Sequence, residues 1–396
     1  MQDNKNFLAA EPIGKLLLKL SIPTVIAQLI NMLYNIVDRI YIGHIPSDGS
    51  LALTGVGVCM PIIMIVTAFA ALVSSGGAPR ASIYMGKQDN ESAENILGNC
   101  FLLQIVISLI LTAILLIWSK DLLLAFGASE NTISYAVDYM NVYAFGTLFV
   151  QLTLGMNAFI TAQGFSTVGM ATVLIGAVTN ILLDPVFIFV LGMGVQGAAL
   201  ATILSQFLSA VWAVSFLRGK KALIRLEWGS MRLQPKLVWQ IVSLGFSSFV
   251  MAITNSIVQV ACNSTLQSFG GDLYVGVMTI INSVREVVST PINGVTSAAQ
   301  PVMGFNYGAR RPDRVLEAQR YIALLCIAFT AVFFLVAQLI PQAFVLIFTR
   351  DPAYVSMASR AIRIFTLGII PMGLQYTIVD GFTGMGVVRA SLPLSF

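Results

Sequence analysis

Charged residues are scarce in this chain: Asp, Glu, Lys and Arg make up only 10% of the 396 residues, whereas 57% are hydrophobic. Soluble globular domains carry about 25% charged residues. The mean hydropathy is +0.84. Composition therefore excludes an ordinary soluble protein and predicts an all-α polytopic membrane protein whose surroundings are the lipid bilayer. The net charge of +4 is small, so we expect no binding to nucleic acid.

Histidine is almost absent, since His44 is the only one, and neither a zinc site nor a histidine-based triad can be assembled around it. Glycine-rich runs such as Ser75-Gly-Gly77 occur, but the chain contains no Gly-Lys-Ser/Thr phosphate loop. The four cysteines are widely spaced in apolar stretches, as packing residues are. These absences disfavour an enzyme, and we expect no cofactor.

Long apolar runs are abundant, and about twenty such residues suffice to cross a bilayer. The first set of expected spans is 16–42, 52–77, 95–118, 135–162, 168–190 and 196–217; the second is 238–264, 274–299, 318–340 and 357–384. With the N-terminus inside, sixteen of the 22 Lys and Arg lie in inner segments. Because basic residues concentrate on the inner side of membranes, we expect a cytoplasmic N-terminus.

The two sets of spans match each other at an offset of 222 residues. Shared positions include Ser75/Ser297, Pro79/Pro301, Gly86/Gly308 and Gly146/Gly368. A unit of six helices makes the repeat parallel, about an axis along the membrane normal. We expect an N-terminal six-helix bundle (1–217), a cytoplasmic linker (218–236) and a C-terminal bundle (237–396). The second bundle would hold four helices and the start of a fifth, so we expect a twelve-helix fold lacking its last two helices; a natural ten-helix protein is the alternative.

A polar stripe runs along the first expected span. Gln28, Asn31, Asn35 and Asp38 follow one another at intervals of three or four residues, which places them on one helical face. An acid inside the bilayer costs roughly 2.5–3.5 kcal/mol on insertion scales, so it usually faces a protein interior or a wet cavity. The stripe predicts a substrate cavity with a coupling acid. The alternative is an interfacial Asp38 paired with the adjacent Arg39.

A second polar group lies at the end of the fifth span. Asn180 and Asp184 share one face, and Pro185 frees a backbone carbonyl one turn earlier. The nearest polar side chains at similar depth are Asn157 on the preceding span and Thr202 on the following one. Together with Asp38, this oxygen-rich set is suited to a proton or to Na⁺, the latter on Asp38, Asn180 and Asp184. The alternative is that Asp184 only caps or turns the helix before Pro185.

Three charged residues inside the second set of spans are candidates for function. Arg285 and Glu286 are adjacent, so they point about 100° apart on a helix and do not simply pair with each other. Glu286 could attract a cationic substrate, or form an internal salt bridge. Asp380 stands where the first repeat has Ala158 and could serve coupling, substrate binding or packing. We count all three among the candidate cavity residues.

Several motifs resemble the multidrug and toxic compound extrusion (MATE) family. They are Pro79-Arg-Ala-Ser-Ile-Tyr-Met-Gly86-Lys after the second span, its echo Pro301-Val-Met-Gly-Phe-Asn-Tyr-Gly308, Asp38 in the first span and Gln163-Gly164 after the fourth. The resemblance covers essentially the whole chain. It implies two six-helix bundles in a V, exchange of drug for H⁺ or Na⁺, a cation site at Asp38, Asn157, Asn180, Asp184 and Thr202, and a second acid at Asp380.

The function expected from residues and resemblance together is multidrug efflux by H⁺ or Na⁺ antiport, with small-molecule drugs or toxic cations as substrates. The bundles would rock against each other, with 218–236 as a flexible tether. We expect a multi-pass monomer in the bacterial cytoplasmic membrane. A flippase of lipid-linked glycan precursors is the alternative, but it would want a strongly cationic cavity, for which Arg39, Arg285 and Arg363 are the only candidates.

Overall fold

The computed structural model describes residues 7–45, 49–346 and 352–394, and the regular structure within these ranges is helical. The elements of the first half are α1 (Phe7–Ala10), α2 (Ile13–Gly43), α3 (Gly49–Gly86), α4 (Asn90–Ala125), α5 (Ile133–Ala162), α6 (Ser166–Pro185), the π-helix η2 (Val186–Val190) and α7 (Gly194–Arg218). They continue with the 3₁₀-helix η3 (Trp228–Ser230), α8 (Pro235–Gly308), α9 (Pro312–Leu339), α10 (Pro341–Leu346), α11 (Pro352–Thr366), α12 (Ile369–Gly384) and α13 (Val388–Leu394). The all-α membrane class is confirmed.

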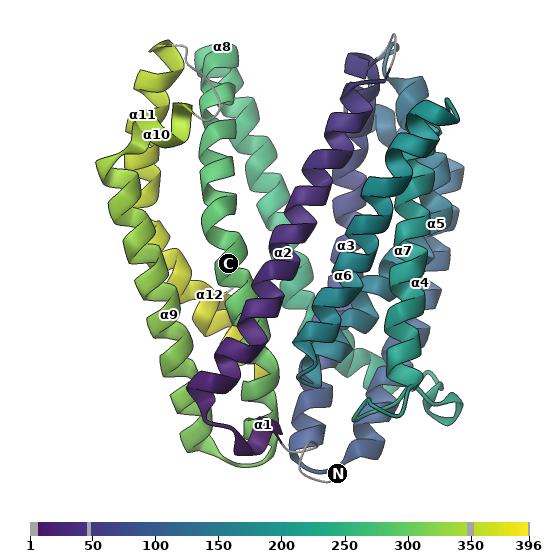
Figure 1. The fold of residues 1–396 in the computed structure, drawn as a ribbon, viewed down its shortest axis with the longest axis vertical. Helices are drawn as coiled ribbons and strands as arrows, with labels where there is room; N and C mark the ends of the chain where they lie inside the picture. Colours follow the sequence, from purple (N-terminus) through teal and green to yellow (C-terminus); the bar gives the residue numbers. More distant parts are fainter. Residues whose placement is uncertain (1–6, 46–48, 347–351, 395–396) are drawn as a thin grey trace.

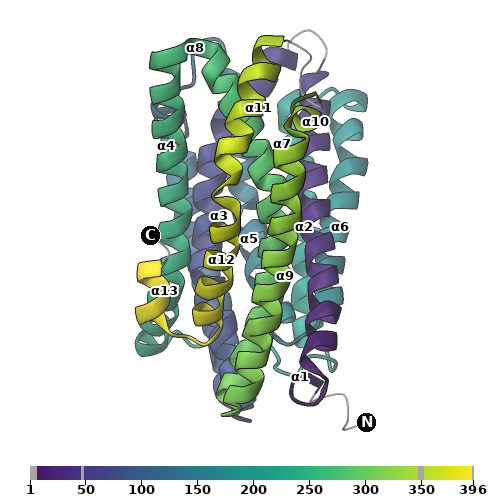
Figure 2. The same cartoon turned by 90° about the vertical axis from the view of Figure 1, so that its left-hand side faces the viewer.

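Two groups of helices converge at the lower end of Figure 1 and diverge at its upper end. α3 to α7 form one group, the second half of the chain forms the other, and α2 crosses between them. Eight helical segments of the described chain are long and apolar enough to span a membrane, or nine with α11 and α12 as one span bent by 45°. Figure 2 shows these two helices in succession along one side. The eighth expected span, 274–299, is helical within α8 but is not among these segments.

α8 is a single helical element of 74 residues that doubles back on itself. Both of its ends touch α3: a Cβ on Gly245 would lie 1.7 Å from the Leu72 carbonyl oxygen, and one on Gly308 would lie 2.0 Å from that of Ile83. Eleven residues of α3 rise only about 16 Å, whereas 63 residues of a straight helix would rise about 95 Å. The two legs visible in Figure 1 therefore take the places of the expected spans 238–264 and 274–299.

The segments Pro79–Gly86 and Pro301–Gly308, which follow expected spans in the sequence, are helical and form the C-terminal ends of α3 and α8. Both helices extend past the apolar run because the extension packs against the opposite half. A Cβ on Gly86 would lie 2.0 Å from the Phe305 carbonyl oxygen, and Gly308 meets Ile83 in the same way. At the offset of 222, Ile83 corresponds to Phe305 and Gly86 to Gly308. The contact is thus reciprocal, as a two-fold axis would make it.

The linker between α7 and α8 is docked on the first group of helices, and its expected role as a flexible tether was wrong. The backbone N–H groups of Leu223 and Ile224 donate to Gln163 Oε1 at 2.7 and 3.1 Å. The N–H of Arg225 donates to Glu94 Oε1 at 2.9 Å, and that of Gln234 donates to Asn99 Oδ1 at 2.8 Å. Four side-chain-anchored backbone bonds hold this segment in place, up to the residue before α8.

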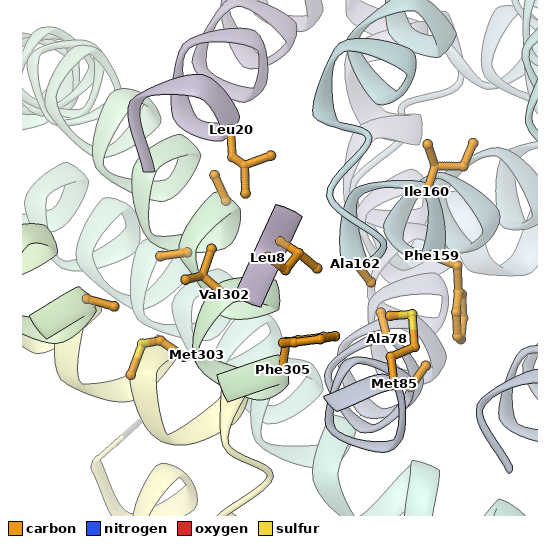
Figure 3. Close-up of a cluster of buried hydrophobic side chains, with 14 of the residues drawn as sticks. Leu8, Leu20, Ala78, Met85, Phe159, Ile160, Ala162, Val302, Met303 and Phe305 are labelled. Atoms are coloured by element: carbon orange, nitrogen blue, oxygen red, sulfur yellow. The ribbon is translucent and has the colours of Figure 1, made fainter. Parts of the chain in front are cut away.

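The largest buried apolar cluster joins the two groups at their lower end. Figure 3 shows Leu8 of α1 between Val302 and Phe305 of α8 on one side and Ala162 of α5 on the other. α2 also belongs to both groups: Val25 packs against Gly294 of α8, whereas Asp38, thirteen residues later, faces α6. A movement of α2 would therefore change its contacts with both halves of the molecule.

Candidate functional site

The acids of α2 and α6 meet inside the first group of helices. Asp38 is 7% exposed, Asp184 is fully buried and Asn180 is 1% exposed. The Asp38 and Asp184 carboxyl groups lie within hydrogen-bonding reach of each other. Asn180 Nδ2 donates to Asp184 Oδ1 at 3.2 Å and lies 3.5 Å from Thr202 Oγ1 on α7. The structure thus brings together four of the five residues expected to bind the cation.

Three oxygens of this group have no donor. Asp38 Oδ1, Asn180 Oδ1 and Asp184 Oδ2 are buried and receive no hydrogen bond from a described residue. Buried polar atoms normally have partners, and two facing carboxyl groups without a positive charge between them are costly in a low-dielectric interior. A proton or an oxygen-seeking cation such as Na⁺ would supply the missing charge.

Local sequence explains why these groups converge. Asn180 and Asp184 are one turn apart on α6, so their side chains stack on the face that packs against α2. Pro185 cannot donate a backbone hydrogen bond, and the chain continues as the π-helix η2 directly after it. Asp184 therefore lies inside a continuing helix and does not merely cap its end.

Two tyrosines belong to the same site, although they were not expected there. Tyr34 on α2 lies near both Asp38 and Asp184, and Tyr139 on α5 lies near Asp38 and against Thr202. Tyr34 precedes Asp38 by four residues, so the spacing rule that found the polar stripe could also have found it. For Tyr139 the sequence carries no comparable signal, because only the packing of α5 brings it to α2.

The remaining residues of the first half are more dispersed. Asn157 is on α5 near Thr161 and Gly169, and its Oδ1 is buried without a donor; no described hydrogen bond joins it to the acids. Along the stripe, Gln28 and Asn35 are exposed and Asn31 is half-buried. Only Asp38 of the stripe is buried, so the other three could contact a substrate but do not form part of the acid cluster.

Arg39 lies near Asp38 but forms no ion pair with it within the described ranges. Its guanidinium group lies 3.9 Å from the Met60 sulfur, and the only ion pair within the described ranges joins Lys19 to Glu11 at 2.9 Å. The expected alternative of an Asp38–Arg39 pair is therefore wrong. In the described part of the chain, Arg285, half-buried, and Glu286, exposed, make no ion pair either.

Asp380 on α12 forms a separate centre in the second half. Its Oδ1 accepts a hydrogen bond of 3.1 Å from Gln300 Nε2 on α8. Gln300 was not expected at a site. The repeat could have indicated it, because Gln300 stands at the repeat position of Ala78 just as Asp380 stands at that of Ala158.

Among described residues, no cluster of three or more His, Cys, Asp or Glu could hold a metal, so any Na⁺ site would also need amide and hydroxyl oxygens.

Comparison with known proteins identifies the family. The sequence model of the MatE family matches residues 23–186 and 247–396. The chain belongs to the MATE family. Two curated relatives are the multidrug export protein MepA of Staphylococcus haemolyticus (strain JCSC1435), 23% identical over 97% of this chain and 84% of that protein, and MepA of Staphylococcus aureus (strain N315), 22% identical over 96% of this chain and 82% of that protein.

The MATE fold is equally clear in three dimensions. A multidrug resistance MATE transporter solved in an outward-facing conformation superposes with a TM-score of 0.90 at 24% identity, over 99% of this chain and 87% of that chain. A MATE protein in complex with MaD3S gives a TM-score of 0.91 at the same identity and coverage. A MOP superfamily transporter from Pyrococcus furiosus Vc1, described as having a binding pocket of reverse polarity, gives 0.90. This MATE chain therefore shares their fold.

Proposed function

We propose that this protein exports cationic, amphipathic small molecules in exchange for H⁺ or Na⁺. The single observation that carries the proposal is the Asp38–Asp184 pair. The two carboxyl groups face each other in a buried site, where three oxygens receive no hydrogen bond. The names of the curated relatives, multidrug export proteins, support the efflux of drugs. The acids Glu286 and Asp380 favour cationic substrates over anionic ones.

The site can couple ion binding to movement. A proton or Na⁺ between the two carboxyl groups holds α2 against α6, and its loss leaves two like charges in contact, which drives them apart. The lower half of α2 packs against α8 and α9, through Val25 on Gly294 and Gly14 on Tyr321. A shift of α2 at Asp38 therefore changes contacts of the other half, as alternating access requires.

The flippase alternative is not favoured. Arg39 contacts Met60 of α3, Arg285 lies on α8, and Arg363 is an exposed residue of α11 whose carbonyl accepts from Gln338. No described contact gathers these cations into a site for a pyrophosphate. We place the protein in the bacterial cytoplasmic membrane, with a cytoplasmic N-terminus, as a monomer.

Efflux of a fluorescent lipophilic cation from proteoliposomes, driven by an imposed pH or Na⁺ gradient, tests the proposal. We expect gradient-driven export, and we expect Asp38→Asn to slow it about ten-fold or more, because each ~1.4 kcal/mol of lost coupling is a factor of ten. Running the two gradients separately assigns the coupling ion.

Asp121→Asn is the matched control, because Asp121 is an exposed acid of α4 and the change removes the same charge. Its efflux should equal that of the unmodified protein. An efflux rate that does not depend on either gradient, or that is unchanged in Asp38→Asn, would refute antiport through this site.

A further inference from the structure

A second polar feature lies between the two groups of helices. A cavity of about 160 Å³ is lined by α3, α5 and α8, and its polar lining comes mainly from hydroxyl groups and one amide: Ser74, Ser75, Ser82, Thr161, Ser297 and Gln300. One water molecule takes up about 30 Å³ in the liquid, so several waters fit. The Asp38–Asp184 site does not contribute to this lining.

Three pairs of positions that are equivalent at the offset of 222 line the cavity from both halves, and one of these pairs differs in polarity. At the offset of 222, Ser75 corresponds to Ser297 and Pro79 to Pro301, and all four line it. Ala78 corresponds to Gln300, and Ala158 corresponds to Asp380. The first half thus supplies two alanines where the second half supplies a hydrogen-bonded Gln–Asp pair.

Gln300 connects the acid to the cavity. It lines the cavity and donates from Nε2 to Asp380 Oδ1 at 3.1 Å, whereas Asp380 itself is not part of the lining. One turn later, a Cβ on Gly304 would lie 2.8 Å from the Gly384 carbonyl oxygen and 3.3 Å from that of Pro79. This stretch of α8 is therefore wedged between α12 and α3, where the halves meet.

Few charged or titratable groups surround Asp380. Tyr376 is one turn earlier on α12 and also interacts with Arg285 of α8; Cys326 approaches from α9. The uncharged neighbours are Thr296 and Gln300 of α8. Of these groups only Gln300 also lines the cavity, so it is the one through which a change at Asp380 reaches the interface between the halves.

We propose that Gln300 is a positioning residue that ties the Asp380 carboxyl group to the cavity between the two halves, so that ion loading at Asp380 acts on their packing. The ionised carboxyl accepts from the amide N–H groups; a proton or Na⁺ on it takes up the accepting oxygen, and the amide turns toward the cavity hydroxyls. This inference rests on the proposed antiport, because it needs an ion to be bound and released.

The test measures the separation of the halves directly. Spin labels at positions 130 and 342, which are exposed in the first and second half, report their distance in the full chain in nanodiscs, after replacement of the four cysteines. We expect the distance to change with pH or Na⁺. Asp380→Asn and Gln300→Ala should each remove the same share of this change, about half, and the double variant no more, because two groups acting as one unit are not additive.

Gln300→Asn, which keeps an amide but cannot reach Asp380, should behave as Gln300→Ala does and provides a second variant if that one folds poorly. Gln338→Ala is the matched control, because Gln338 links α9 to the carbonyl of Arg363, away from the cavity; it should leave the change intact. The inference is overturned if Gln300→Ala keeps the full change, if Asp380→Asn removes none of it, if the double variant loses more, or if the unmodified protein shows none. Loss of gradient-driven efflux in liposomes is a separate readout, so failure of the proposed antiport is recognised independently.

Discussion

The Asp38–Asp184 centre and the Asp380 centre differ in the hydrogen bonds that their oxygens receive. At the first, Asp38 and Asp184 face each other, and three oxygens of the group have no donor. At the second, Asp380 stands alone and already accepts from Gln300. The first centre thus leaves three buried oxygens without a donor, whereas the second already receives a hydrogen bond from the protein. We infer that the first carries the main coupling ion and that the second adjusts the response.

Replacing one acid at each centre should produce the largest contrast. Asp184→Asn leaves Asp38 facing an amide and removes the paired negative charge that retains the cation, so gradient-driven efflux should fall about ten-fold or more, while Asp380→Asn should lower it only about two- to three-fold. The measurement is initial efflux rate in proteoliposomes at matched protein content. Equal losses in the two variants would contradict the division of roles.

At the crossing of α3 and α8 the two halves are alike rather than different. Gly86 abuts the Phe305 carbonyl and Gly308 abuts that of Ile83, so the repeat positions exchange places in the contact. A side chain at either glycine would push two backbones apart, and the effect should be the same from either side.

Gly86→Ala and Gly308→Ala should therefore each lower the stability of the protein by about 1–3 kcal/mol, the usual cost of overpacking. Gly57→Ala is the control on α3, because nothing lies within 4 Å of a Cβ placed there, and it should be neutral or stabilising through helix propensity. Thermal unfolding in detergent measures all three. A large loss at one glycine and none at the other would show that the contact is not reciprocal.

Much of this architecture could be predicted from sequence because its signals are local. Apolar length located the helices, and helical spacing placed Asp38 on the polar stripe of α2 and paired Asn180 with Asp184 on α6. The sequence also placed Thr202 at the same depth as Asn180, and the two side chains lie 3.5 Å apart in the structure. The duplication at an offset of 222 stays a prediction. The reciprocal contacts of Gly86 and Gly308 are consistent with it.

The features that the sequence did not reveal depend on contacts between distant segments. The charged linker 218–236 looked flexible, yet Gln163, Glu94 and Asn99 fix its backbone. Pro79 and Pro301 follow the apolar runs of expected spans, yet both lie in helices whose ends pack on the opposite half. Gln300 is polar where the first repeat has Ala78, but only the structure shows that its side chain binds Asp380 on α12.

The smallest difference between the two halves lies in the turns that follow α3 and α8. Gln88 and Arg310, equivalent at the offset of 222, are the only described non-glycine residues with positive φ, at 63° and 56°. The next residues differ: Asp89 caps α4 by accepting from the Ser92 N–H at 3.0 Å, whereas Arg311 donates to the Ala9 carbonyl at 3.0 Å. One turn caps a helix and the other holds α1.

These turns should respond differently to acid. The Ser92 side chain, then its backbone N–H, with the Lys87 charge adding to them, hold the pKa of Asp89 below its ordinary value. A lowered folded-state pKa stabilises the protein above the unfolded value of about 4, and this contribution is lost as pH falls through the folded pKa. The stability difference between the unmodified protein and Asp89→Ala should therefore shrink between neutral pH and about pH 3. The difference for Arg311→Gln should stay constant, because its hydrogen bond to the Ala9 carbonyl involves no carboxyl group. Thermal unfolding across this range measures both, and a constant difference for Asp89→Ala would show that its capping bond does not depend on the ionised carboxylate.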